Sequence, residues 1–113
     1  MKRACAVVLA LAAGLTAADR APLPWEKDRL RAGQALYREN CVVCHDIDKA
    51  DSKKLGPSFY RLFQREKMPL AKMKPSRDYI KVRVQFGGPL MPAFRQRLNA
   101  AQIETLIDYM ASK

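Results

Sequence analysis

The chain has 113 residues and a formal net charge of +10 at pH 7, and 49% of its residues are hydrophobic. This length is enough for one small domain and excludes a large multidomain architecture for this sequence. A domain of this size buries only a modest share of its surface, so a metal, disulfide or cofactor at its centre would contribute strongly to its stability.

Residues 1–18 are typical of a secretory signal peptide: Lys2 and Arg3, then an uncharged apolar stretch, then small residues before Asp19. The alternative is an uncleaved membrane anchor, but the apolar stretch is shorter than the roughly 20 residues of a spanning helix. We therefore expect export to the periplasm, cleavage, and no stable membrane insertion of the mature chain. Residues 19–27 then form a lead-in to a domain over residues 28–113.

The positive charge of the mature chain is concentrated in its middle. Between Lys49 and Arg83 there are eleven lysines and arginines against three carboxylates, whereas the rest of the mature chain has eight residues of each sign. Such a run is most often a solvated face; it can also dock an acidic partner or compensate an anionic cofactor. Nucleic acid is a poor candidate partner for an exported chain without a recognisable binding motif.

The first predicted element is a helix. Residues 19–27 are expected to be irregular because Pro22 and Pro24 oppose helix formation. Residues 28–40 have apolar residues at helical spacing, with Gly33 in the interior, where glycine costs about 0.5–1 kcal/mol relative to alanine. A glycine at such a position indicates that another backbone crosses closely there, and the C-terminal helix is the expected partner.

The rest of the chain alternates irregular segments with two further predicted helices. Residues 45–59 are rich in turn formers and charges and contain the turn Gly56-Pro57. Ser76 is placed to cap a helix running to about Phe86, although the apolar spacing there also suits a strand. Asn99, with Gln102 three residues on, predicts the capped start of a last helix. The chain is therefore expected to be all-α, with more loop than such a protein normally holds together unaided.

The segment "NCVVCH", residues 40–45, contains the two cysteines of the mature chain and its only histidine. A zinc site needs four ligands, usually as two separated pairs, and no second pair exists. A dithiol oxidoreductase places C-x-x-C at the start of a helix after a strand, whereas here it follows a helix. C-x-x-C-H is the attachment sequence for haem c, in which Cys41 and Cys44 form thioethers and His45 binds the iron. This reading is favoured, because a large apolar cofactor would also organise the loops.

A second axial iron ligand must come from a residue other than histidine. The mature chain offers four methionines: Met68, Met73, Met91 and Met110. Met110 lies on the apolar face of the last helix, where core packing is the expected role, and the first two lie in a lysine-rich loop. Met91 lies between prolines in "GGPLMPAF", and a thioether on a stiff loop suits an iron site that changes little between oxidation states. A ligating histidine also needs its other ring nitrogen held, and the Pro57 carbonyl is a candidate acceptor.

The sequence resembles a class I c-type cytochrome of the small bacterial monohaem kind. "GQALYRENCVVCH" resembles the N-terminal helix and haem motif of that family, "GPSFYRLFQR" its Gly-Pro loop, and "GGPLMPAF" its axial-methionine loop. The resemblance implies a small cytochrome c fold, with N- and C-terminal helices crossing and long loops around one covalently bound haem. It also implies that Met91 is the sixth ligand, that the carbonyl of Pro57 accepts from His45, and that Arg65 faces a haem propionate.

The function expected from these features is single-electron transfer between larger redox proteins with acidic docking surfaces. Such a chain is an electron carrier rather than an enzyme, either free or as a subunit of an oxidoreductase complex. The alternative is a haem-based sensor or catalytic haem subunit with a weak or open sixth iron position, in which Met91 is merely structural. A dithiol protein is a third and less favoured alternative.

Overall fold

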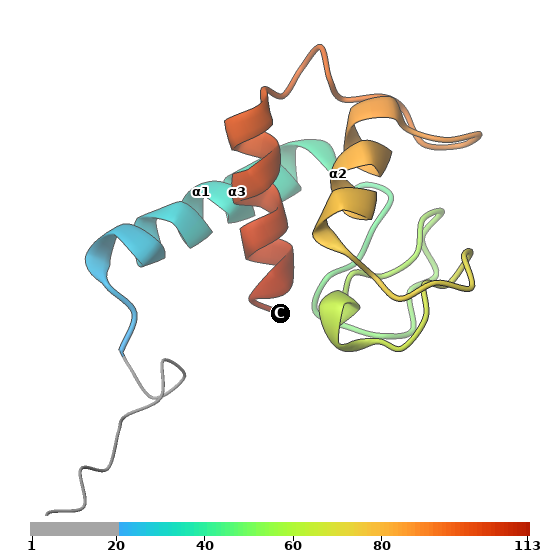
Figure 1. Cartoon of the computed structure of the whole chain (residues 1–113), viewed down its shortest axis with the longest axis horizontal. Coiled ribbons are helices and arrows are strands. Elements are labelled where there is room, and N and C mark those ends of the chain that lie inside the picture. Colours follow the sequence, from blue (N-terminus) through green and yellow to red (C-terminus); the bar gives the residue numbers. More distant parts are fainter. Residues whose placement is uncertain (1–20) are drawn as a thin grey trace, which may run out of the picture.

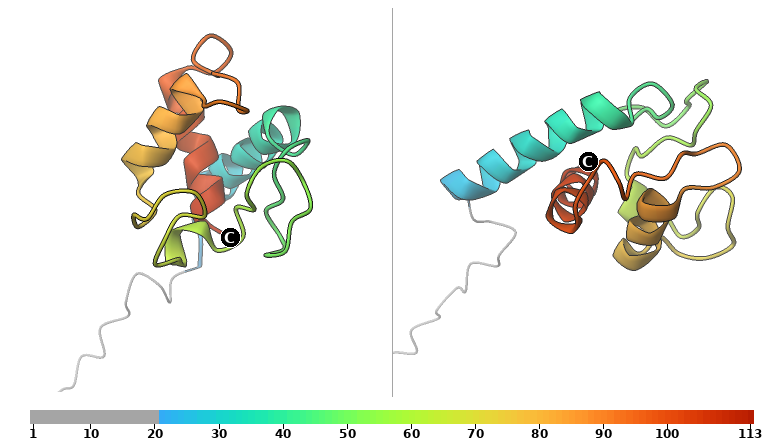
Figure 2. Two further views of the ribbon diagram at one scale, coloured as in Figure 1. Left: turned by 90° about the vertical axis from the view of Figure 1, so that its right-hand side faces the viewer. Right: turned by 90° about the horizontal axis from the view of Figure 1, so that it is seen from above.

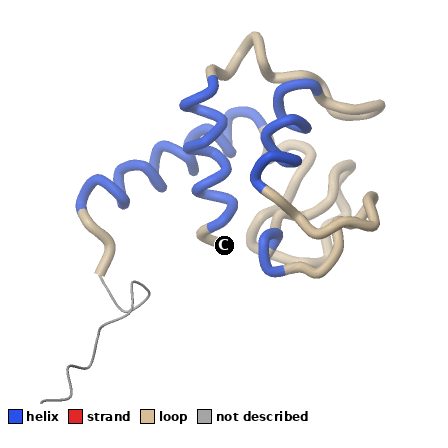
Figure 3. The backbone as a smooth tube through the Cα atoms, viewed as in Figure 1, coloured by secondary structure: helices blue, strands red, loops and turns tan. Residues whose placement is uncertain are grey.

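The computed structural model describes residues 21–113, and throughout that range every regular element is a helix (Figures 1 and 3). In chain order they are α1 (Pro24–Asn40), η2 (Leu62–Gln64, a single 3₁₀ turn), α2 (Arg77–Phe86) and α3 (Ala100–Ala111). The all-α prediction is thus confirmed, and the region between Ser76 and Phe86 is a helix rather than a strand. The predicted signal peptide lies outside the described residues.

Helix α1 begins four residues earlier than the sequence indicated. The prediction that residues up to 27 are irregular is wrong from Pro24 onward, because Pro24 occupies the first helical position. A proline is favourable there, since its missing N–H would have no helical partner and its φ is already helical. The preceding N–H, of Leu23, is satisfied by the Glu26 carboxylate at 2.6 Å. Pro24 was therefore a signal for the start of the helix rather than a helix breaker.

Helices α1 and α3 cross in close contact (Figures 1 and 2). A Cβ atom added to Gly33 would lie 2.5 Å from the backbone oxygen of Thr105 and 2.6 Å from Cβ of Tyr109. Side chains do not approach backbone so closely, so only glycine permits this crossing. The rings of Tyr37 and Tyr109 lie beside it, with centroids 6.0 Å apart. The close approach predicted from a glycine inside a helix is confirmed.

Both later helices begin at the predicted caps. The Ser76 side chain accepts from the N–H of Tyr79 at 3.2 Å. At α3, the side chain of Asn99 accepts from the N–H of Gln102 at 2.9 Å, and the Gln102 side chain accepts from the N–H of Asn99 at the same distance. This reciprocal pair satisfies two N–H groups that the helix itself leaves free.

The hydrophobic core is centred on α3. Its four most deeply buried large side chains all come from this helix: Ile103, Leu106, Ile107 and Met110. Met110 therefore packs in the core, as expected from its place on the apolar face. An ion-pair network adds to this packing, since Arg77 of α2 lies 2.6 Å from Asp108 and 3.1 Å from Glu104. The network is exposed, so its contribution to stability is small.

The long irregular segments gather at one end of the molecule, away from the N-terminal half of α1 (Figures 1 and 2). They include the stretch between α1 and α2, which holds the C-x-x-C-H sequence, and the stretch between α2 and α3, which holds Met91. Among residues 21–113, no helix is both long enough and apolar enough to cross a membrane.

Candidate functional site

The C-x-x-C-H segment is the turn that ends α1. The N–H of Cys41 still donates to Tyr37 of the helix at 2.8 Å, and the N–H groups of Cys44 and His45 both donate to the carbonyl of Cys41, at 3.1 and 2.9 Å. The compact turn buries Cys41, leaves Cys44 half-buried, and forms no disulfide between them. Two free thiols and an imidazole are thus presented within one turn of chain.

The environment of Cys41 argues against a dithiol oxidoreductase. Burial is the main cause that raises the pKa of the Cys41 thiol to about 11, and the neighbouring Cys44 raises it further. Reactive cysteines of redox enzymes have the opposite property, a lowered pKa that populates the nucleophilic thiolate. A protonated, buried thiol is unsuited to disulfide exchange, and suits a cysteine whose sulfur becomes covalently attached to a buried group.

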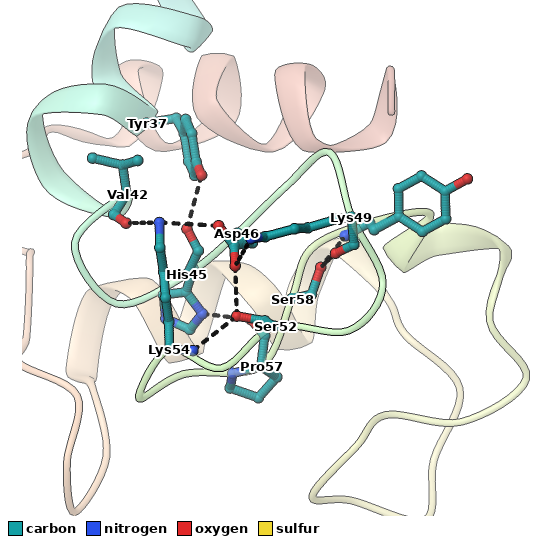
Figure 4. Close-up of polar contacts among 10 residues, drawn as sticks. Tyr37, Val42, His45, Asp46, Lys49, Ser52, Lys54, Pro57 and Ser58 are labelled. Carbon is teal, nitrogen blue, oxygen red and sulfur yellow. Dashed lines mark hydrogen bonds and ion pairs between the residues drawn. The ribbon is translucent and has the colours of Figure 1, made fainter.

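His45 is held in one orientation by two neighbours, Pro57 and Phe59. Its Nδ1 lies 2.7 Å from the carbonyl oxygen of Pro57, the contact that the resemblance implied (Figure 4). The ring stacks on Phe59, with centroids 4.3 Å apart and planes at 21°. Because the carbonyl can only accept, Nδ1 carries the proton and Nε2 carries the lone pair. The histidine is therefore prepared to bind a metal through Nε2.

Gly56 lies against the same ring. A Cβ atom at this position would lie 2.6 Å from Nδ1 and 2.7 Å from Nε2 of His45, over the face of the imidazole. Gly56 also donates its N–H to the carbonyl of Cys44 at 2.7 Å, so its backbone cannot retreat from the ring without losing that bond. The sequence marked this residue only as part of a turn. Its structural role is to leave room for the histidine.

The charge state of His45 also suits a metal ligand. Burial is the largest influence and lowers the pKa of His45; the Pro57 carbonyl opposes this, and the nearby Lys54 lowers the pKa further. The imidazole is therefore neutral at pH 7, and its Nε2 lone pair is not competed for by a proton.

The backbone around His45 is braced from α1 and from the following loop. The hydroxyl of Tyr37 donates to the carbonyl of His45 at 2.8 Å (Figure 4). On the other side, the N–H of Phe59 donates to the carbonyl of Asp46 at 2.7 Å. The histidine is thus fixed at its backbone as well as at its ring, although it lies in a segment with no regular structure.

Asp46 closes the loop between His45 and Pro57. Its carboxylate accepts from the Ser52 hydroxyl at 2.8 Å and pairs with Lys54 at 3.0 Å (Figure 4). The hydrogen bond from Ser52, followed by that from Lys54, lowers the pKa of Asp46 below its usual value. Lys54 also donates to the carbonyl of Val42 within the C-x-x-C turn. A single carboxylate thereby connects the loop to the segment that contains the cysteines.

Met91 lies in a loop that folds back onto the C-terminal end of α2. The N–H of Phe94 donates to the carbonyl of Val84 at 2.9 Å, and the N–H of Gly88 donates to the carbonyl of Met91 at the same distance. The last carbonyls of a helix have no helical partner, so this loop satisfies one of them. Gly87 makes the turn possible with a φ of +70°. Met91 itself is half-buried and packs against the core.

The other predicted site residues have less definite places. Met68 is also half-buried against the core, and its N–H donates to the carbonyl of Met73 at 2.8 Å, while Met73 is half exposed. Arg65 donates to the carbonyl of Tyr60 at 2.6 Å, so its guanidinium braces its own loop. A contact between Arg65 and a haem propionate stays a prediction.

The arrangement fits haem c better than zinc. Within residues 21–113, no group of three or more histidine, cysteine, aspartate or glutamate side chains is placed to hold a metal ion. The donors instead suit a large group that contributes most of its own ligands: two free thiols, a neutral imidazole with Nε2 available, and a glycine that clears the imidazole face. The residues present therefore fit a covalently attached haem.

Comparison with known proteins leads to the same conclusion. Residues 28–110 match the model of the family described as cytochrome c oxidase, cbb3-type, subunit III. No solved structure matches the chain. The matched range covers most of α1, the C-x-x-C-H turn, the Met91 loop and all but the last residue of α3, which together are the parts of the site described above. The chain therefore belongs to this family of c-type cytochrome domains, and as such is a haem c electron carrier.

Proposed function

We propose that this chain is an exported monohaem cytochrome c in which Cys41 and Cys44 attach the haem and His45 and Met91 are its axial ligands. The observation that carries the proposal is the hydrogen bond of 2.7 Å between His45 and Pro57, with Gly56 clearing the ring. This arrangement fixes the direction of Nε2, which matters only if that nitrogen binds a metal. When bound, haem c supplies one iron centre that cycles between the ferric and ferrous states.

The surrounding protein residues would keep both proposed iron ligands in the same position in the ferric and ferrous states. His45 cannot rotate while its Nδ1 is bonded to Pro57 and its ring is stacked on Phe59. Met91 is restrained because its carbonyl accepts from the N–H of Gly88 within the loop, and because the loop is bonded to Val84 of α2 through the N–H of Phe94. Ligands that stay in place in both oxidation states reduce the rearrangement that accompanies electron transfer, and a thioether ligand raises the reduction potential. Two protein ligands also leave no open position for a substrate.

Covalent attachment is tested directly by mass spectrometry of protein produced in a bacterial periplasm with haem-attachment machinery. We expect one haem per chain, a mature chain that begins near Asp19, and loss of the covalent haem when both cysteines are replaced by alanine. A wild-type protein with free, titratable thiols and no visible absorption would contradict the proposal and favour a dithiol protein.

The proposed partner is a larger redox protein with an acidic docking surface. The description of the family as an oxidase subunit supports a partner of this kind. The chain would contact that partner either as a subunit of the same complex or in transient encounters. Much of the basic segment is already engaged inside the molecule: Lys54 with Asp46, and Arg77 and Lys81 with Glu104. Among the described residues, no ion pair involves four exposed lysines of that segment: Lys53, Lys67, Lys72 and Lys74. These lysines are the proposed docking charges.

An anionic oxidant tests this surface before the partner is identified. We expect the rate of oxidation by hexacyanoferrate(III) to fall as ionic strength rises, because salt screens exposed charges beyond about 10 Å at 0.1 M. Replacing Lys72 and Lys74 with glutamine should flatten that dependence. The matched control, glutamine at Lys27 and Arg38 of α1, removes the same charge elsewhere and should not. Equal effects of the two double variants would contradict a local docking surface.

A further inference from the structure

The side chain of Arg83 spans the point where the Met91 loop leaves α2. Its Nη1 donates to the carbonyl of Gly87 at 3.1 Å, and its Nη2 donates to the hydroxyl of Tyr79 at 2.9 Å. Arg83 is half-buried, and its guanidinium carbon lies 5.5 Å from the centre of the Tyr79 ring. One planar group is therefore anchored on the body of the helix and bonded to the first residue of the loop.

The position of this guanidinium is favourable for two reasons. Arg83 lies in the last turn of α2, where a cation interacts well with the negative end of the helix dipole. Among the described residues, no carboxylate forms an ion pair with Arg83. The guanidinium thus donates to two neutral acceptors, the Gly87 carbonyl and the Tyr79 hydroxyl, and not to a carboxylate.

Gly88 leaves the space that the guanidinium occupies. A Cβ atom at Gly88 would lie 2.5 Å from Nη1 of Arg83, and among the described residues, its two chain neighbours aside, only Arg83 comes within 4 Å of it. An alanine at this position would therefore displace the end of the arginine side chain rather than the backbone. Gly87 differs, because its φ of +70° and the backbone of Pro92, 2.8 Å from an added Cβ, require glycine for the turn itself.

We propose that Arg83 is a positioning residue that holds the Met91 loop against α2. The loop leaves the helix through two successive glycines, which by themselves leave its direction poorly fixed. The bond from Arg83 to Gly87 fixes that direction, and the bond from Gly88 to Met91 transmits it to the residue that bears the thioether. This inference rests on the proposed function, because it matters for electron transfer only if Met91 is an iron ligand.

The test measures how often the loop opens in the ferric holoprotein. Imidazole in solution can replace Met91 only when the loop moves away, so its binding rate reports opening. We expect Arg83→Gln to raise this rate about fivefold, the factor that one net hydrogen bond is worth. Gly88→Ala should raise it to a similar extent by displacing Nη1. The double variant should be no faster than either single one, because both changes remove the same bond.

A matched control removes a neighbouring charge without touching the loop carbonyl. Arg95 lies at the far end of the same loop, with its guanidinium 5.2 Å from the ring of Phe86. Arg95→Gln should leave the imidazole rate unchanged. Effects of Arg83→Gln and Gly88→Ala that add in the double variant, or wild-type rates in both single variants, would overturn the role of Arg83.

Failure of this inference is distinguishable from failure of the proposed function. In the ferric protein, the weak near-infrared band of sulfur-ligated haem should be present, should survive Arg83→Gln at neutral pH, and should be lost in Met91→Ala. If Met91→Ala keeps the band, the proposed ligation is wrong, and the role of Arg83 is overturned with it. If Met91→Ala loses the band but Arg83→Gln binds imidazole at the wild-type rate, only the role of Arg83 is overturned.

Discussion

Gly56→Ala is the smallest change that should disturb the histidine ligand. The added methyl group would lie 2.6 Å from Nδ1 and 2.7 Å from Nε2 of His45, well inside the contact distance of about 3.5–4.0 Å for such atoms. The backbone of Gly56 has no positive φ, so alanine is not excluded by conformation. The collision with the imidazole is therefore the source of the destabilisation.

The size of the effect follows from the two ways in which the clash can be relieved. The ring can turn, which breaks its hydrogen bond to Pro57 and moves it off its preferred rotamer, at about 1 kcal/mol each. Alternatively the backbone can retreat, which breaks the bond from Gly56 to Cys44 and shifts the neighbouring turn at a similar cost. Either route costs about 2 kcal/mol, which lowers the melting temperature of a domain of this size by about 8–16 °C.

The assay is thermal unfolding of the ferric holoprotein, together with its optical spectrum. Pro57→Ala is the matched control, because it keeps the carbonyl that accepts from His45 and changes only the stiffness of the chain. Its expected cost is about 1 kcal/mol or less. A Gly56→Ala protein with the melting temperature and spectrum of the wild type would refute the account of how His45 is held.

Two further changes test the helix crossing and the closed loop. Gly33→Ala should lower stability by about 1–3 kcal/mol in thermal unfolding, because the clash with the Thr105 backbone outweighs a gain in helix propensity of about 1 kcal/mol; a more stable variant would contradict the close crossing. Asp46→Asn should lower the melting temperature at pH 7, because Ser52 and Lys54 stabilise the ionised carboxylate. Since these bonds lower the pKa of Asp46 in the folded state, the stabilisation is complete above an unfolded pKa of about 3.9 and is lost as pH falls through the folded value. Wild-type and variant melting temperatures should therefore converge as the pH is lowered below about 3.9 and through the folded pKa of Asp46, and a difference independent of pH would contradict this role.

The features predictable from sequence were those set by local chemistry or by one strong constraint. The caps at Ser76 and Asn99 and the buried face of α3 follow from short-range spacing, which tertiary contacts here reinforce. Gly33 was informative because its cost inside a helix requires a compensating contact. The contact between His45 and Pro57 was predicted because a ligating histidine needs its other ring nitrogen held, the resemblance implied it as well, and the structure contains it.

Other parts of the site could not be predicted because they depend on where loops lie in three dimensions. The sequence marked Gly56 as part of a turn. Nothing in the neighbouring residues showed that the imidazole of His45 would lie against it. The stacking of Phe59 on His45 depends on the same loop closure. Arg83 was the exception, since its spacing of four from Gly87 in a predicted helix was a usable signal for a brace at the helix end. The early start of α1 at Pro24 was missed because proline was weighed only as a breaker.

The central claim, that His45 and Met91 are the two axial ligands, is tested most directly by the near-infrared spectrum of the ferric protein. The account predicts a weak sulfur-to-iron band that is lost in Met91→Ala and retained in Met68→Ala, the other half-buried methionine of the loops. A high-spin ferric spectrum without that band, or a band lost in Met68→Ala instead, would contradict the assignment. The first of these outcomes would favour an open iron site, as in a sensor or catalytic haem subunit.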